Sequence, residues 1–126
     1  MFWDVFLSFR IDVSCQSDSA KNVPKVVNDR TSETKTGMKK RRIAGSNVCT
    51  SDLAVEASKQ ALDDAKLKPE DIDLIILATS SPDVPLSSTA GIIQHKLGCT
   101  DCAAFDINAV CAGWVHALDI GSRYVG

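Results

Sequence analysis

The chain has 126 residues, of which 44% are hydrophobic and 24% charged, a mixture that excludes a disordered or collagen-like chain and indicates a globular one. Fourteen Lys and Arg residues against sixteen Asp and Glu residues give a net charge of −2, so charge gives no reason to expect nucleic acid or an anionic membrane as the partner. The longest purely apolar run, 74–78, is too short to cross a bilayer.

The cysteine count and the first residues bear on the compartment. Five cysteines are an odd number, which leaves one unpaired in any full disulfide scheme. The first ten residues include Asp4 and Arg10 and hold no apolar run long enough for a signal core, and four Asp within the first thirty argue against a transit peptide. We therefore expect a cytoplasmic protein whose thiols are reduced.

The chain divides near residue 45 into two unequal parts. Residues 1–45 form an irregular N-terminal segment with one candidate strand over 1–11, a polar stretch rich in loop-forming residues and a basic run over 35–42. Residues 46–126 carry regular helix and strand signals. We expect the second part to be the folded region.

The first regular element is a helix predicted over 52–66, because apolar residues recur on one half of its helical wheel. Ser51 or Asp52 is expected to accept the free amide hydrogens of its first turn, and Pro69 to end the segment. The near-continuous apolar stretch within 71–79 predicts a strand covered on both faces, which is typical of a parallel sheet.

The remaining elements follow in alternation. Prolines at 82 and 85 predict a loop over 80–87, and a second helix is expected over 88–97, closed by Gly98 in a left-handed conformation. A second buried strand is predicted over 102–107 and a third helix over 111–125. This order indicates an α/β fold with a parallel or mixed sheet and right-handed crossovers.

One cysteine lies where chemistry is expected. Cys111 comes directly after the predicted strand and opens the third helix, where free amide hydrogens and the positive end of the helix dipole stabilise a thiolate. Ala112 and Gly113 leave room for an acyl group beside it. Taken alone, Cys111 is equally consistent with a small buried cysteine that only packs.

Other candidate residues favour structural roles. Cys99 and Cys102 have the spacing of a redox motif, but they lie between a helix end and a strand, and no second pair completes a zinc site, so no metal is expected. His116 follows Cys111 by five residues, about 140° around the helix. We expect His116 and His95 to be surface or structural residues.

Residues 35–125, about seven tenths of the chain, resemble the N-terminal half of β-ketoacyl-acyl carrier protein synthase III. The resemblance is carried by KTGMKKRRIA (35–44), LAVEA (53–57), PEDIDLII (69–76), ATSSPD (78–83), STA (88–90), KLG (96–98) and FDINAVCAGW (105–114). It implies one incomplete half of a thiolase-like fold.

The resemblance also implies a reaction. In that family a cysteine takes the acetyl group of acetyl-CoA, and malonyl-acyl carrier protein then loses CO₂ and attacks the acyl-cysteine. Cys111 is the implied nucleophile, with its backbone N–H as one oxyanion donor. The His and Asn that assist decarboxylation come from the family's second half and have no counterpart here, so this chain alone is expected to be inactive in condensation.

Further roles rest on the same resemblance. Lys35 stands where the family has an arginine and is the implied contact for a CoA phosphate, while Leu86 stands at an acyl-pocket position. Acyl carrier protein is the implied partner, a homodimer the implied assembly, and no cofactor is needed beyond acetyl-CoA as substrate. Two alternatives stay open: another thiolase-fold synthase, of the hydroxymethylglutaryl-CoA or polyketide type, and a non-catalytic remnant that only binds or dimerises.

Overall fold

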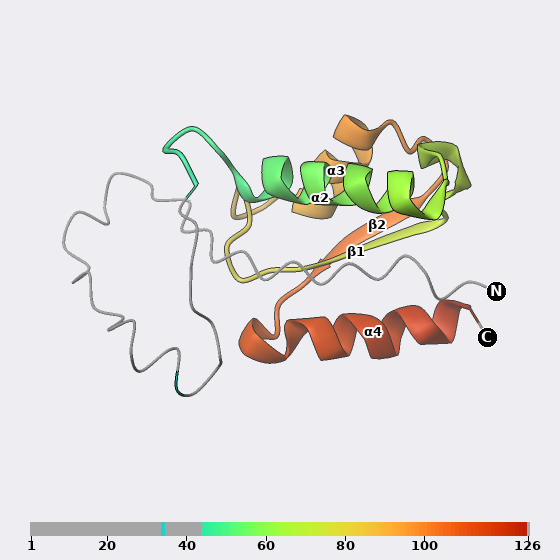
Figure 1. Cartoon of the computed structure of the whole chain (residues 1–126). Helices are drawn as coiled ribbons and strands as arrows, with labels where there is room; N and C mark the ends of the chain where they lie inside the picture. Colours follow the sequence, from blue (N-terminus) through green and yellow to red (C-terminus); the bar gives the residue numbers. More distant parts are fainter. Residues whose placement is uncertain (1–33, 35–43, 126) are drawn as a thin grey trace.

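The computed structural model describes residues 34 and 44–125, arranged in three layers (Figure 1). Helices α2 (Thr50–Ala65) and α3 (Thr89–Leu97) lie on one side of the strands β1 (Leu74–Ala78) and β2 (Ala103–Ile107), and α4 (Gly113–Tyr124) lies on the other. The predicted strand over 1–11 and the basic run over 35–42 lie outside the described residues. None of the helices within the described part combines the length and apolarity needed to traverse a bilayer.

The two strands pair in parallel, which confirms the predicted α/β class. Leu74 lies opposite Ala103 and Ala78 opposite Ile107, so the two carboxyl ends meet at one edge of the sheet. Both strands are shorter than predicted: Pro69–Asp71 forms a 3₁₀ turn ahead of β1, and β2 begins one residue later, at Ala103. Helices lie on both faces of β1, as predicted, but each of its residues is half-buried, since the described sheet has two strands and each keeps an open edge.

Helix α2 begins and ends earlier than the sequence pattern predicts. Cys49 is its N-cap, and the Cys49 N–H donates to Asp52 Oδ2 at 2.9 Å. Ser51 does not cap the helix, because its hydroxyl accepts a hydrogen bond from Lys96 instead. The helix ends at Ala65 and not at Pro69, since Lys66 adopts a left-handed conformation and donates its N–H to Leu62 and Asp63. The buried face is formed by Ser51, Val55, Ala57, Ala61 and Leu62.

A polar cluster joins the N-terminal end of α2 to the last turn of α3. Lys96 Nζ donates to Ser51 Oγ at 2.7 Å and to Asp52 Oδ1 at 2.6 Å. The hydrogen bond from Lys96, together with that from the Cys49 N–H, lowers the pKa of Asp52. The same contact with Asp52 raises the pKa of Lys96. Because Ser51 is fully buried, the lysine satisfies a hydroxyl that water cannot reach.

Helix α3 begins one residue later than predicted and ends at Leu97, as predicted. Ser88 is the N-cap and accepts from the Gly91 N–H at 3.2 Å. Gly98 closes the helix with φ of +80°, a conformation that glycine adopts at little cost. Its residue Ile93 is the largest fully buried side chain of the described part.

Asp106, in the middle of β2, binds the start of α3. Its Oδ2 accepts from the Thr89 N–H and its Oδ1 from the Ala90 N–H, both at 2.7 Å, and the Ser88 hydroxyl donates at 3.2 Å. These are charge-assisted bonds at a helix N-terminus, where a carboxylate also gains from the helix dipole. Asp106 therefore joins strand and helix at the carboxyl edge of the sheet.

Replacing Asp106 with alanine is expected to lower the free energy of unfolding by about 2–3 kcal/mol, because two helix N–H groups lose their acceptor in a partly buried place. Chemical denaturation followed by circular dichroism measures this change. Asp64→Ala, on the exposed side of α2, is the matched control and is expected to stay within about 0.5 kcal/mol of the wild type. Equal losses in the two variants would contradict the role given to Asp106.

Helix α4 begins two residues later than predicted, because Val110–Ala112 forms a 3₁₀ turn before it. Its first residue, Gly113, is buried against β1: a Cβ there would lie 3.1 Å from the Ala78 Cβ. Glycine thus lets the helix start close to the strand. Further along, Arg123 and Asp119 form an exposed ion pair at 3.0 Å.

Candidate functional site

Cys111 lies at the carboxyl edge of the parallel sheet. It is the middle residue of the 3₁₀ turn Val110–Ala112, which connects β2 to α4, and it is exposed. In open α/β sheets, ligands bind outside the carboxyl ends of the strands. The structure thus brings the predicted nucleophile to the edge where a substrate is expected, one residue ahead of the N-cap of α4.

The turn around Cys111 is held by its backbone. The Ala112 N–H donates to the Ala109 carbonyl at 3.0 Å, and the Gly113 N–H donates to the Val110 carbonyl. The Val110 N–H faces Asn108 Oδ1 at 3.5 Å. These bonds use the amide hydrogens on either side of Cys111 but not that of Cys111 itself.

The three described helices differ in what their N-termini bind. At α2, the Ser51 N–H donates to Asp83 Oδ1 at 3.0 Å, and at α3 the first amides donate to Asp106. Helix α4 has no acidic residue in its first turn and no side-chain cap. Among the described helices, α4 is therefore the one whose start has no side-chain acceptor, and the amide of its first residue, Gly113, donates to the Val110 carbonyl.

The loop 80–87 lies at the carboxyl edge of the sheet and is hydrogen-bonded to both α2 and α3. Thr50 Oγ1 donates to the Ser81 carbonyl at 2.7 Å, and the Asp83 N–H donates to Thr89 Oγ1 at 3.0 Å. Leu86, the predicted pocket residue, lies on this loop with its side chain fully exposed. The described residues do not enclose its side chain, so lining an acyl pocket would need a second protein surface packed against Leu86. Lys35 lies outside the described residues.

The second cysteine pair is buried. Cys99 and Cys102 are 3% and 7% exposed, and Cys102 Sγ lies 3.8 Å from the Cys99 carbonyl oxygen. Burial, reinforced by the neighbouring Cys102, raises the pKa of Cys99 to about 11, so its thiol stays protonated at neutral pH. No group of three or more metal-ligating side chains is found among residues 34 and 44–125.

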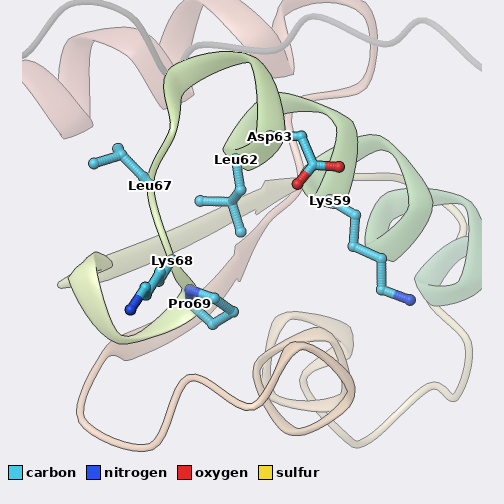
Figure 2. A pocket seen from close by; sticks show the side chains of 6 residues that line it. All are labelled: Lys59, Leu62, Asp63, Leu67, Lys68 and Pro69. Atoms are coloured by element: carbon cyan, nitrogen blue, oxygen red, sulfur yellow. The ribbon is translucent and has the colours of Figure 1, made fainter.

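Two shallow hollows of the described part lie away from Cys111, which lines neither of them. One, of about 330 Å³, lies where α2 runs into β1 and is lined by Lys59, Leu62, Asp63, Leu67, Lys68 and Pro69 (Figure 2). It lies at the amino end of β1, opposite the edge that carries Cys111. The other, of about 420 Å³, is lined by residues of the α3 end and by Cys99.

Comparisons with known proteins place this chain in a family. The β-ketoacyl-[acyl-carrier-protein] synthase III of Caldanaerobacter subterraneus subsp. tengcongensis is 54% identical over 92 residues, which are 73% of this chain and 28% of that protein. The chain belongs to the synthase III family. It spans less than a third of the length of the curated synthase III relatives that it matches. No protein-family model matches it.

Solved structures agree with the thiolase-like half-fold. The synthase III of Aquifex aeolicus VF5 superposes with a TM-score of 0.69 at 42% identity, covering 79% of this chain and 32% of that one. A single-substitution variant of OleA from Xanthomonas campestris superposes with a TM-score of 0.66 at 34% identity, covering 74% of this chain and 29% of that one. The described residues are thus an incomplete α/β half of the fold that synthase III and OleA share.

Two features of this candidate site were missed by the sequence analysis. Asp106 carried a signal, because a carboxylate inside an apolar strand is seldom buried unless it is paired. Val110 carried none: its left-handed backbone, with φ of +47°, is unusual for a β-branched residue. The predicted surface positions of His95 and His116 are confirmed, since both are exposed.

Cys111 is expected to react with iodoacetamide at neutral pH faster than the other cysteines, because it is exposed at a helix start while Cys99 and Cys102 are buried. Cys99 is expected to be slowest, since its thiol stays protonated. Mass spectrometry of peptides from a brief labelling pulse ranks the sites, and the same pulse in denaturant is the control. Equal labelling of all sites in the folded protein would count against a nucleophile at Cys111.

Proposed function

We propose that this chain is the acyl-accepting part of a fatty-acid condensing enzyme of the synthase III type. In the proposed step the Cys111 thiolate attacks the carbonyl carbon of acetyl-CoA and a carbon–sulfur bond forms. The carbonyl electrons move to oxygen, and the oxyanion then collapses and expels coenzyme A as its thiolate. The product is an acetyl group in thioester linkage to Cys111.

The observation that carries the proposal is the exposed Cys111 thiol just before α4, in a chain that is 54% identical over 92 residues to a synthase III. The Cys111 N–H, which the hydrogen bonds of the turn do not use, is the proposed donor for the oxyanion. The other helix starts at this edge are already bonded to Asp83 and Asp106, so they have fewer amides to offer.

The second step, condensation with malonyl-acyl carrier protein, needs groups that this chain does not provide. Decarboxylation leaves a carbanion on the malonyl unit, which then attacks the acetyl carbonyl on Cys111. In this family a His and an Asn from the second half polarise the malonyl carbonyl. The described histidines do not replace them, since His95 is exposed near the end of α3 and His116 is exposed on α4.

The test of this proposal is incubation of the 126-residue chain with acetyl-CoA and malonyl-acyl carrier protein. We expect slow acetylation of Cys111 and no acetoacetyl product, because acylation needs only the nucleophile and the oxyanion donors. Peptide mass spectrometry detects the acetyl group, and chromatography detects the product. Acetoacetyl-carrier product from this chain alone would contradict the need for the second half, and absence of acetyl-Cys111 would contradict the acceptor role.

The finer assignments belong to the same proposal. Lys35 is proposed to contact a CoA phosphate, since an ammonium group binds phosphate as a point charge. Leu86 is proposed to line the acyl pocket together with a second subunit, because its side chain is exposed here. Acyl carrier protein is the proposed macromolecular partner, and acetyl-CoA serves as substrate with no further cofactor.

The alternative thiolase-fold synthase has structural support of its own. One OleA structure and a tetronic acid condensing enzyme superpose with TM-scores of 0.66 and 0.59, each at 34% identity. The synthase III sequences are closer, at 50–55% identity. A panel of acyl-CoA donors separates the two: preference for acetyl-CoA supports the synthase III assignment, and preference for a long-chain donor supports the alternative. A chain that accepts no acyl group is the non-catalytic remnant.

A further inference from the structure

Val110 and Lys66 are the two non-glycine residues of the described part with positive φ. Lys66, with φ of +57°, ends α2, a place where left-handed residues are common. Val110, with φ of +47°, does not end a helix: it opens the turn that carries Cys111. A β-branched residue in this region is a genuine outlier, because its side chain crowds the backbone.

Packing of the valine side chain does not account for this conformation. Val110 is 72% exposed, so little apolar burial offsets the backbone strain. The cause lies in the path of the chain. Ile107, the last residue of β2, pairs with Ala78 of β1, and Gly113, the first residue of α4, abuts the same Ala78. The connection 108–112 therefore begins and ends beside the same residue of β1, and within it the backbone takes a positive φ at Val110.

We propose that Val110 is a positioning residue for Cys111. Its backbone is held in the left-handed region, and its β-branched side chain limits the other conformations of the turn, so that together they fix the direction of the Cys111 thiol and N–H relative to α4. The inference rests on the proposed acyl-acceptor role. Valine restricts the turn more than glycine does, because glycine enters both left-handed and right-handed regions freely. Strained residues of this kind persist where the surrounding structure holds them, and they gather at functional sites.

Acyl transfer and alkylation depend differently on this positioning. Attack on a thioester needs the thiolate at the carbonyl carbon and, at the same moment, the N–H donors at the carbonyl oxygen. Alkylation by iodoacetamide needs only an accessible thiolate. Loosening the turn should therefore slow acyl transfer and leave alkylation nearly unchanged.

The experiment compares the full chain with Val110→Gly, using acetyl-CoA and iodoacetamide as separate reagents. We expect the acetylation rate of Cys111 to fall about tenfold, because a small displacement of a reacting group is costly, while alkylation stays within about twofold. The thermal midpoint should be no lower than that of the wild type, since glycine relieves the strain and little packing is lost. Val110→Asn, which keeps a Cβ and tolerates the left-handed region, should retain most of the acetylation rate.

Lys66→Gly is the matched control, because it relieves the other left-handed residue far from Cys111 along the chain. It should change neither rate. If Val110→Gly acetylates as fast as the wild type, the positioning role is overturned while the acceptor role stands. If the wild-type chain takes no acetyl group on Cys111, the acceptor role fails and this inference falls with it. A parallel loss of acetylation and alkylation in Val110→Gly would show general loosening and would also overturn the positioning role.

Discussion

Replacing Cys111 with alanine is expected to abolish acetyl transfer from acetyl-CoA to this chain, with a loss of at least about a hundredfold. No other described thiol combines exposure with a place at a helix start: Cys99 and Cys102 are buried, and Cys49 is half-buried. Because Cys111 is exposed, the substitution should change the free energy of unfolding by no more than about 0.5 kcal/mol. Intact-protein mass spectrometry after a timed incubation measures the acetyl group.

Cys49→Ala is the matched control for this experiment. Cys49 caps α2, and its removal should leave acetylation of Cys111 unchanged. Acetylation of the Cys111→Ala chain at the wild-type rate would assign the acceptor role to another residue. An acetylation loss in Cys49→Ala of the same size would indicate that the edge as a whole, and not the Cys111 thiol, governs the reaction.

The local patterns predicted the elements well, because each depends on neighbours in sequence. The wheel of α2 and the left-handed Gly98 both follow from residues within a few positions of one another. The exact ends of α2 did not follow. Lys96, distant in sequence, takes the hydroxyl of Ser51 that was expected to cap the helix, and such a contact cannot be read from local sequence.

The site was predicted in part for the same reason. The position of Cys111 between a strand and a helix is a local feature, and the structure confirms that the thiol lies at the start of α4. The left-handed turn at Val110 is set by two elements that both meet Ala78. The capping of α3 by Asp106 joins positions well apart in sequence. Both depend on tertiary contacts, for which the sequence pattern carries no direct signal.

The carboxyl edge of the sheet carries both the structural contacts and the proposed acyl acceptor, at different helix starts. Asp83 and Asp106 occupy amides at the starts of α2 and α3, so these two carboxylates stabilise the fold. Helix α4 keeps its first amides unbonded to any side chain, and the thiol lies beside them. A carboxylate placed at the start of α4 would compete with the oxyanion that the proposed reaction forms.

The 126-residue chain is expected to self-associate or aggregate at micromolar concentration, because α4 presents apolar side chains to solvent. Trp114, Val115, Tyr124 and Val125 are 45%, 62%, 66% and 65% exposed. Each large apolar side chain left in water forgoes about 1.5–3 kcal/mol of burial, whereas the net stability of a domain is only about 5–15 kcal/mol. Few large side chains are fully buried in the described part, Ile93 among them, so little reserve offsets that loss.

Sedimentation velocity over a range of concentrations measures the association, and paired variants locate it. The double substitution Trp114→Gln and Val115→Gln should shift the chain towards monomer, because it removes the largest exposed apolar surface at the start of α4. Val84→Gln, which removes an exposed valine from the loop 80–87, is the matched control and should leave the distribution unchanged. The open edge of β2 offers a second route to association, since its unpaired backbone groups can bond to another strand. A wild-type chain that sediments as a single monomer and unfolds in one sharp, reversible transition would show instead that these residues close their own core.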